Sequence, residues 1–194
     1  GLWTMRTLKG KFILGIGVIY ALIGSLTIVA FYMGAERIIE VFGTKYAVNQ
    51  ALLEKNKVLS LIEREVALAL KLADDPLIRQ WCRQEHDERL KRNAFAQLAS
   101  YRKIFRNQSF FVAIVDSGHY YVYDTKKNKL DLTTLRRDKP ADKWFFHTIR
   151  DVDSFALNVD YNALLNVIKV WINTVLKDEK GNNIAVVGSG IDIS

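Results

Sequence analysis

The feature that most constrains this chain is a run of 22 residues without a charged side chain, from Phe12 to Met33. As an α-helix rising ~1.5 Å per residue, this run would be roughly 33 Å long, enough to cross the hydrocarbon layer of a membrane. A buried helix of a soluble protein rarely stays uncharged for so long. The apolar region of a cleaved signal peptide is usually shorter and is followed by small residues, whereas Phe31-Tyr32-Met33-Gly34 is bulky. We therefore predict an uncleaved transmembrane helix over residues 12–33.

The charges that flank this span predict its orientation. Three basic residues precede the span and a group of mixed charge follows it: Arg6, Lys9 and Lys11 before, Glu36, Arg37 and Glu40 after. Because a basic excess marks the cytoplasmic side, we expect residues 1–11 to be cytoplasmic and the chain from about Gly34 onward to lie outside. In a bacterium this describes an inner-membrane protein with a periplasmic or extracellular domain. The net charge of +7 is then no sign of a nucleic-acid partner.

Residues 34–73 predict a stalk helix that continues from the membrane. The segment contains no proline, and its apolar residues recur at helical spacing. Leu52, Leu59 and Val66 are seven apart, as along the seam of a coiled coil. Two interpretations stay open, a helix packed on its own domain and a stalk that pairs with a second copy. We expect a parallel homodimer through part of this helix.

Residues 74–194 predict a separate α+β domain. Asp75 can cap a new helix and Pro76 suits its first turn, so a helix is expected to run to about Phe105. Its charged middle indicates either a solvated face or a break between two helices. Beyond it, alternating apolar residues and turn signals predict an antiparallel sheet of five strands with a polar loop and one short helix. The expected strands are 110–115, 119–124, 155–161, 166–176 and 184–193, with the loop at 126–138 and the helix at 142–149.

Five short segments of this region resemble a known family. They are Phe111–Asp116, Tyr120–Asp124, Asp142–Phe146, Val175–Asn182 and the closing Val186–Ile193, with glycines before an aspartate. In their order and spacing they resemble the extracytoplasmic Cache sensor domains of bacterial transmembrane receptors, over about residues 34–194. The resemblance implies a PAS-like sheet and the membrane-distal lobe of a double-Cache receptor, cut off here before its output module. It points most to a diguanylate cyclase receptor, with chemoreceptors and histidine kinases as alternatives.

The resemblance also implies a ligand site between the sheet and the segment that covers it. Seven side chains are implicated: Trp144 and Phe145 as walls, Tyr121, Tyr123 and Tyr161 as hydroxyl groups, Asp192 as partner of a ligand amine, and Arg137 as a carboxylate clamp. In amino-acid-binding relatives an arginine stands two positions before the tryptophan, where this chain has Asp142. The departure favours an amine, an amino-acid-like compound bound through Arg137, or another small metabolite.

Nothing in the sequence predicts an enzyme. No phosphate-binding loop, nucleophile elbow or zinc-protease motif occurs, and no catalytic residue or cofactor is expected. Cys82 and His86 have the spacing of a metal-binding pair on a helix, but two ligands alone do not make a metal site. The competing interpretation is that the aromatic residues form only a core and that the domain is a structural dimerisation module.

Overall fold

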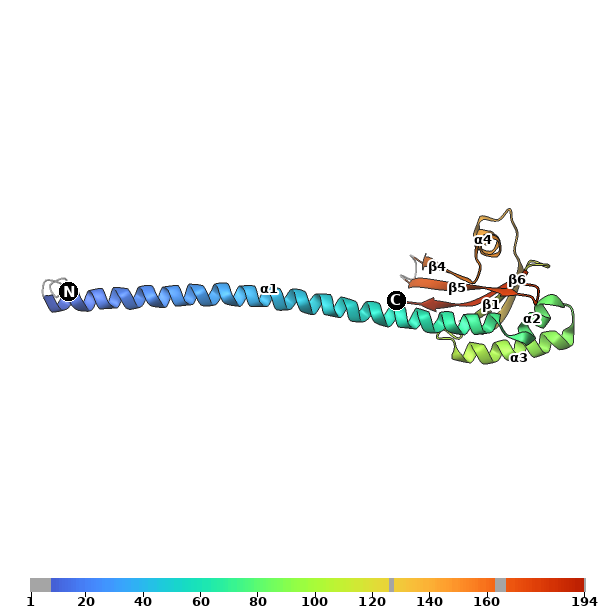
Figure 1. Cartoon of the computed structure of the whole chain (residues 1–194), viewed down its shortest axis with the longest axis horizontal. Coiled ribbons are helices and arrows are strands. Elements are labelled where there is room, and N and C mark those ends of the chain that lie inside the picture. Colours follow the sequence, from blue (N-terminus) through green and yellow to red (C-terminus); the bar gives the residue numbers. More distant parts are fainter. Residues whose placement is uncertain (1–7, 126–127, 163–166, 194) are drawn as a thin grey trace. The chain divides into compact units, whose positions relative to one another are not determined.

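The computed structural model describes residues 8–125, 128–162 and 167–193. They fall into two compact units, residues 1–56 and residues 57–194, and each is described by itself. Helix α1 (Leu8–Ala73) supplies all the described residues of the first unit and the opening segment of the second (Figure 1). The predicted transmembrane and stalk segments therefore lie in one helix, which ends where the sequence predicted.

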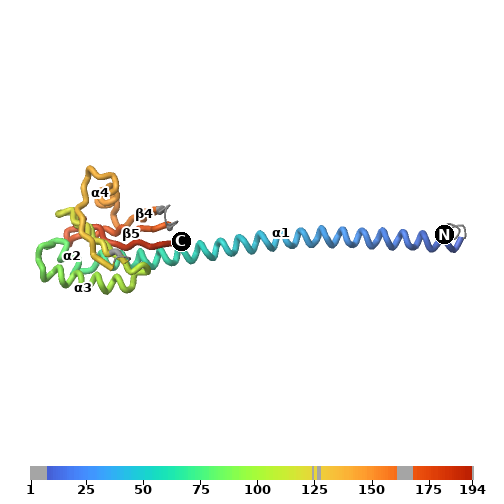
Figure 2. The backbone as a smooth tube through the Cα atoms, turned by 180° about the vertical axis from the view of Figure 1, so that it is seen from behind, coloured from blue at the N-terminus to red at the C-terminus, as the bar shows by residue number. Residues whose placement is uncertain are grey.

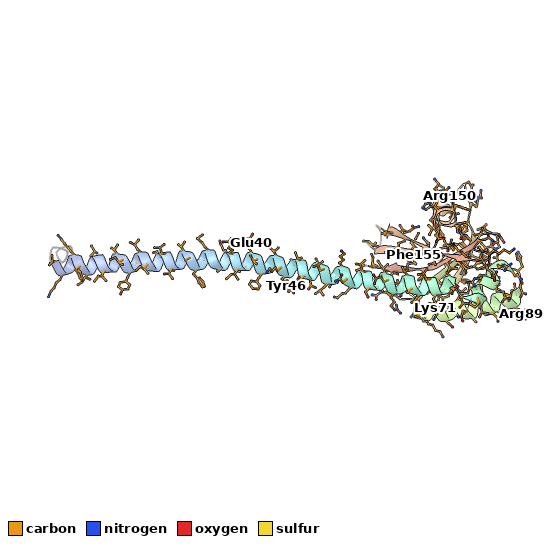
Figure 3. The ribbon with its side chains drawn as sticks, viewed as in Figure 1. Glu40, Tyr46, Lys71, Arg89, Arg150 and Phe155 are labelled. Atoms are coloured by element: carbon orange, nitrogen blue, oxygen red, sulfur yellow. The ribbon has the colours of Figure 1, made fainter. Side chains whose placement is uncertain are left out.

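The first unit contains a candidate membrane span, followed by a helical stretch in which charged and exposed apolar residues alternate. An 18-residue window near the N-terminus of α1 has a mean hydropathy of 2.4, and none of it is buried, which makes it a candidate membrane span. Glu40 and Tyr46 follow this window, and both side chains stand exposed (Figure 3). Leu52, part of the predicted heptad stripe, is 48% exposed.

The end of α1 packs on its own domain, which agrees with one of the two interpretations of the stripe. Ala69 and Leu72 are fully buried, and Ile62 and Val66 pack partly against the same core. Glu65 is also buried, and its carboxylate accepts hydrogen bonds of 3.2 Å from the backbone N–H of Arg106. These contacts fix the last turns of α1 against the rest of the second unit.

Two shorter helices follow, where a single helix was one expectation. Asp75 caps α2 (Pro76–Arg83), with its carboxylate accepting from the N–H of Leu77 at 3.0 Å. The helix ends at Arg83, and Asp87 caps α3 (Glu88–Ile104) in the same way. The charged middle of the predicted helix is therefore the break between two helices, because a second capping aspartate starts a new one.

Within the described ranges, the sheet is antiparallel throughout and has six strands in the order β3-β2-β1-β6-β5-β4. The strands are β1 (Phe110–Ile114), β2 (His119–Asp124), β3 (Lys129–Thr134), β4 (Phe155–Asn162), β5 (Val167–Lys177) and β6 (Asn183–Asp192). The prediction of five strands was wrong at β3, which lies inside the expected polar loop. This edge strand alternates only Leu130 and Leu132 with polar residues, and Leu132 is exposed, so its apolar signal is weak.

Helices cover both faces of the sheet. The end of α1 with α2 and α3 packs on one face, here called the helix face, and η2 (Pro140–Asp142) with α4 (Lys143–Asp151) lies over the other, the α4 face. The view from behind shows the same arrangement (Figure 2). Because strand side chains alternate, Val112 and Ile172 point to the helix face, while Phe111 and Trp171 point to the α4 face.

Candidate functional site

The predicted site residues divide between the two faces of the sheet. Tyr121 and Tyr123 pack with the helix-face core, whereas Trp144 and Phe145 belong to the core under α4. The structure therefore does not bring Tyr121 and Tyr123 together with Trp144. Tyr120 contacts Trp144 instead, with ring centroids 5.8 Å apart. Because side chains alternate along a strand, the sequence shows that Tyr120 points to the opposite face from Tyr121 and Tyr123. Only the packing shows that the face of Tyr120 is the one that α4 covers.

Tyr121 takes part in a buried polar cluster. Its hydroxyl donates to Glu85 Oε1 at 2.7 Å, and His119 Nδ1 lies 2.7 Å from the same oxygen. Burial alone would raise the pKa of Glu85, but hydrogen bonds from Ser117, Tyr121 and His119 together hold the pKa below its ordinary value. This cluster joins the α2–α3 connection to the sheet. Tyr121 is buried within it and is not accessible to a ligand.

Removing the charge of Glu85 is expected to destabilise the domain in a pH-dependent way. Since the folded-state pKa is lowered, the ionised carboxylate contributes stability above its unfolded pKa of ~4.3, and this is lost as pH falls through the folded-state value. We expect Glu85→Gln to cost about 2 kcal/mol at pH 7 and much less near pH 3. Urea unfolding of both proteins at the two pH values measures the difference. A gap that widened on acidification would contradict the assignment.

A cavity of about 360 Å³ lies between α4 and the sheet. We call it the α4 cavity, and it is lined by Phe111, Tyr120, Ala141, Trp144, Asn158, Val159, Asp160, Trp171 and Asn173. Four of these side chains are aromatic. The Phe111 ring lies 5.7 Å from Trp144 and 6.1 Å from Trp171, centroid to centroid. Its volume and its largely apolar lining with a few polar groups are those of a small-molecule site.

The polar groups of the α4 cavity come from β4 and β5. Asn158 and Asp160 alternate along β4, and Asn173 faces the cavity from β5. Asn173 is 1% exposed, and its Nδ2 has no hydrogen-bond partner among the described residues. A buried amide without a partner costs about 1–3 kcal/mol, and an acceptor atom of a ligand would remove this cost. Burial and, as a smaller contribution, the negative charge of Asp142 raise the pKa of Tyr120 to about 12, so its phenol stays protonated.

Asp192 lines a second cavity, at the end of the sheet where β6 ends. This Asp192 cavity, of about 510 Å³, is lined by Asn107, Ser109, Phe110, Val122, Tyr123, Thr125, Asp131, Lys169, Trp171 and Asp192. Two predicted residues, Tyr123 and Asp192, meet here. Lys169 Nζ lies 3.9 Å from Asp192 Oδ1 and 4.4 Å from the centre of the Trp171 ring. Trp171 lines both cavities, so its indole ring is their shared wall.

Three other predicted residues lie elsewhere. Arg137 does not line the α4 cavity, because its guanidinium stacks on the ring of Phe146 with 4.6 Å to the centroid. Phe145 is buried in the core under α4 and lines neither cavity. The side chain of Tyr161 lies outside the described residues. Asp142, the departure from the family pattern, is buried, and its carboxylate accepts from the N–H of Arg136 at 2.9 Å.

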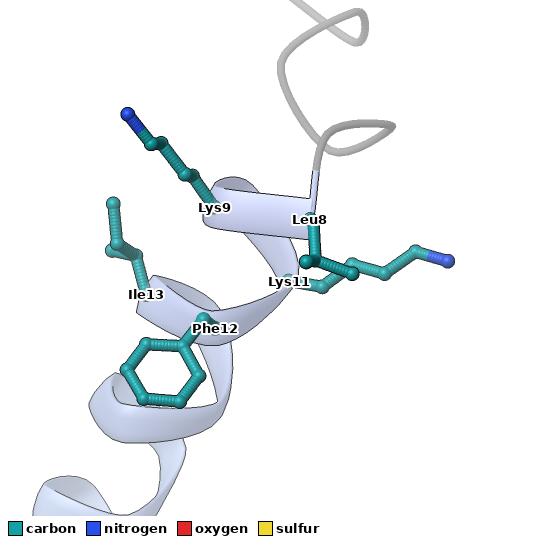
Figure 4. A pocket seen from close by; sticks show the side chains of 5 residues that line it. All are labelled: Leu8, Lys9, Lys11, Phe12 and Ile13. Atoms are coloured by element: carbon teal, nitrogen blue, oxygen red, sulfur yellow. The ribbon is translucent and has the colours of Figure 1, made fainter.

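A further hollow does not enclose a site. It measures about 530 Å³ and lies at the start of α1, where Figure 4 shows its lining residues Leu8, Lys9, Lys11, Phe12 and Ile13. All of them come from two turns of one helix, so no second element among the described residues closes the space. Lysines next to apolar residues are typical of the end of a membrane span.

No metal centre is found in the part of the chain that the structure describes, where no group of three or more His, Cys, Asp or Glu is arranged to hold an ion. Cys82 is buried in α2, and His86 lies beyond the end of that helix. The two residues therefore do not share a helix face.

Comparison with known proteins identifies the fold. No protein-family model matches the chain. Among solved structures, methyl-accepting chemotaxis protein X is similar at 15% identity and a TM-score of 0.53, over 79% of this chain and 64% of that one. The extracellular domain of vpHK1S-Z8, described as a histidine kinase, is similar at 15% identity and a TM-score of 0.51, over 77% of this chain and 57% of that one.

The chain therefore has the α+β sensor-domain fold of chemoreceptors and histidine kinases, as the sequence predicted. It spans less than two thirds of the length of either neighbour. These similarities establish the fold.

Proposed function

We propose that this chain is the extracytoplasmic ligand-sensing part of a bacterial inner-membrane receptor, with its ligand bound in the α4 cavity. The observation that carries the proposal is Asn173. Its buried amide lacks a hydrogen-bond partner among the described residues, and it faces a cavity with aromatic walls. In a structural dimerisation module, an unpaired buried amide would only lower stability, because an apolar side chain at the same position would be more stable.

The lining of the α4 cavity favours a small amine. Aromatic rings attract cations through their faces, and Asp160 adds a carboxylate, while no lysine or arginine is among the lining residues. The Asp192 cavity contains an internal example of the same chemistry, since the ammonium of Lys169 lies between Trp171 and Asp192. Asn173 and the Tyr120 phenol can donate to an oxygen of the ligand, so an amine with a hydroxyl or carboxylate group is the best fit.

Signal transmission would use the contacts that hold the end of α1. A ligand shifts a receptor only if it binds two arrangements unequally. Glu65 ties α1 to the residues just before β1, and Arg64 Nη2 donates to the carbonyl of Ile104 at 3.0 Å. A small movement of the sheet would therefore move the end of α1. If two copies pair through the exposed heptad stripe of α1, this movement would be transmitted along the helix to the membrane. The fold neighbours favour a chemoreceptor or histidine kinase output and give no support to the diguanylate cyclase prediction.

A pair of isosteric probes tests the proposed ligand class. We expect choline to raise the melting temperature of the full chain in neutral detergent micelles. Its uncharged isostere 3,3-dimethylbutan-1-ol should not raise it. At 100 times its dissociation constant, a ligand stabilises by ~2.7 kcal/mol, which corresponds to a rise of roughly 5–11 °C.

The size of the amine is varied in the same assay, from methylammonium to tetramethylammonium. Equal shifts with choline and its isostere would show that charge is not recognised. No shift with any of these amines would refute an amine ligand in the α4 cavity.

A further inference from the structure

A second group of side chains on α4 is left unused by the ligand cavity. Arg137, Lys143, Phe146, His147 and Arg150 line a hollow of about 290 Å³, here called the basic hollow. Lys143, His147 and Arg150 are spaced by four and three residues, so they follow one face of α4. All three side chains are exposed, and Arg150, labelled in Figure 3, is 76% exposed.

The loop before α4 holds Arg137 in place at this hollow. Leu135 is buried in the core under α4, and its N–H donates to the carbonyl of Gly118 at 2.8 Å. One residue further on, the N–H of Arg136 donates to the buried carboxylate of Asp142. Between these anchors and η2, the guanidinium of Arg137 stacks on Phe146. The side chain is thus oriented before any ligand arrives, which lowers the entropy cost of binding.

The carboxylates near the hollow are already engaged by other cations. Asp138 forms a two-point pair with Arg136, at 3.0 and 2.7 Å, and Lys139 Nζ lies 3.7 Å from Asp142. Asp151 accepts from both Arg150 and His147, at 2.7 and 2.6 Å.

Arg137 and Lys143 therefore keep their charges uncompensated. Among the described residues, neither has a carboxylate within ion-pair distance. With Arg150 and His147 sharing one aspartate, the hollow carries a surplus of positive charge that no described side chain neutralises.

We propose that the basic hollow binds a small multivalent oxyanion of the phosphate or polycarboxylate class. The planar guanidinium of Arg137 can donate two parallel hydrogen bonds to such a group, and Lys143 and Arg150 add charge from α4. The volume admits one small anion. The site is separate from the α4 cavity, since the two share no lining residue, and it does not depend on the nature of the ligand bound there.

The test uses inorganic phosphate and the full chain in neutral detergent micelles, at low and constant ionic strength. We expect isothermal titration calorimetry to detect one phosphate per chain. Arg137→Gln and Lys143→Gln should each weaken binding about tenfold or more, because each removes a charge-assisted hydrogen bond. Arg89→Gln and Lys180→Gln remove the same charge from exposed positions elsewhere and should change the affinity less than about twofold.

Two results would overturn the site. One is the absence of phosphate binding to the unaltered protein. The other is an equal loss in the hollow variants and in the two controls, which would mean diffuse attraction to a basic surface. Thermal melts of all four variants check that each is folded, since Arg137→Gln also removes the stacking of the guanidinium on Phe146.

Discussion

Gly188→Ala is expected to destabilise the second unit by about 3 kcal/mol, the largest effect of any single methyl group in this domain. A Cβ atom at Gly188 would lie 1.8 Å from the carbonyl oxygen of Ile172 and 2.9 Å from its carbonyl carbon. Both are backbone atoms of the paired strand β5, so no side chain can move aside. The strands would have to separate at the middle of the sheet. Urea unfolding followed by tryptophan fluorescence measures the loss.

Gly190→Ala provides the matched control, on the same strand and the same face. A Cβ atom there would meet Lys169 Cε at 2.5 Å and the Trp171 ring at 2.9 Å. Both are parts of side chains that can shift, and the expected loss is only about 1 kcal/mol. Equal losses at the two positions would mean that the close approach of β5 to Gly188 is not what requires glycine there.

Trp144→Ala is expected to weaken choline binding about 30-fold, the largest effect on ligand affinity. The substitution removes the aromatic wall that α4 supplies to the cavity, and a desolvated cation–π contact contributes ~2 kcal/mol. Trp144→Phe keeps a ring at the position and should cost about threefold. Isothermal titration calorimetry gives the affinities, and a thermal melt of each variant separates lost binding from lost folding.

The same measurement on Asp192→Asn decides between the two cavities. With the amine in the α4 cavity, this variant should change the affinity less than about threefold, since Asp192 lines the other cavity. A strong loss in Asp192→Asn together with normal binding in Trp144→Ala would place the amine in the Asp192 cavity, where the sequence first suggested its partner. Normal binding in both variants would remove both cavities from consideration.

Much of the fold followed from local signals. The uncharged run predicted the apolar first part of α1, which is a candidate membrane span, and Asp75 with Pro76 predicted the start of α2, because capping depends on neighbouring residues. The alternation in β5 placed Lys169, Trp171 and Asn173 on one face, as the structure has them. Strand β3 was not predicted because its alternation of apolar and polar residues is short and lies among charged residues.

The candidate site followed less well, for a physical reason. Alternation shows that Tyr120 and Tyr121 point to opposite faces, but which face receives α4 depends on how distant segments pack. The sequence therefore suggested Tyr121 as a ligand-binding residue, but the Tyr121 hydroxyl donates to Glu85, and Tyr120 is the tyrosine that lines the α4 cavity. Asn173 was missed for a similar reason, since an amide among apolar neighbours gives no sign of whether a partner lies opposite. Trp144, which lines the α4 cavity, was predicted from the Asp142–Phe146 segment, because that resemblance rests on a local pattern.

The position of β6 has a consequence for how the domain is made. This strand, the last of the six along the chain, lies between β1 and β5, where Phe111 pairs with Gly188 and Val170 with Ile191. A chain that emerges from its N-terminus can form two separate pieces early, β3-β2-β1 and β4-β5, each with an unpaired edge. Only the arrival of β6 joins them, and such distant pairing is slow. Biogenesis would thus pass through a stage in which β1 and β5 are open sheet edges in addition to β3 and β4. A chaperone that shields these two edges until synthesis reaches Asp192 would protect this domain from aggregation.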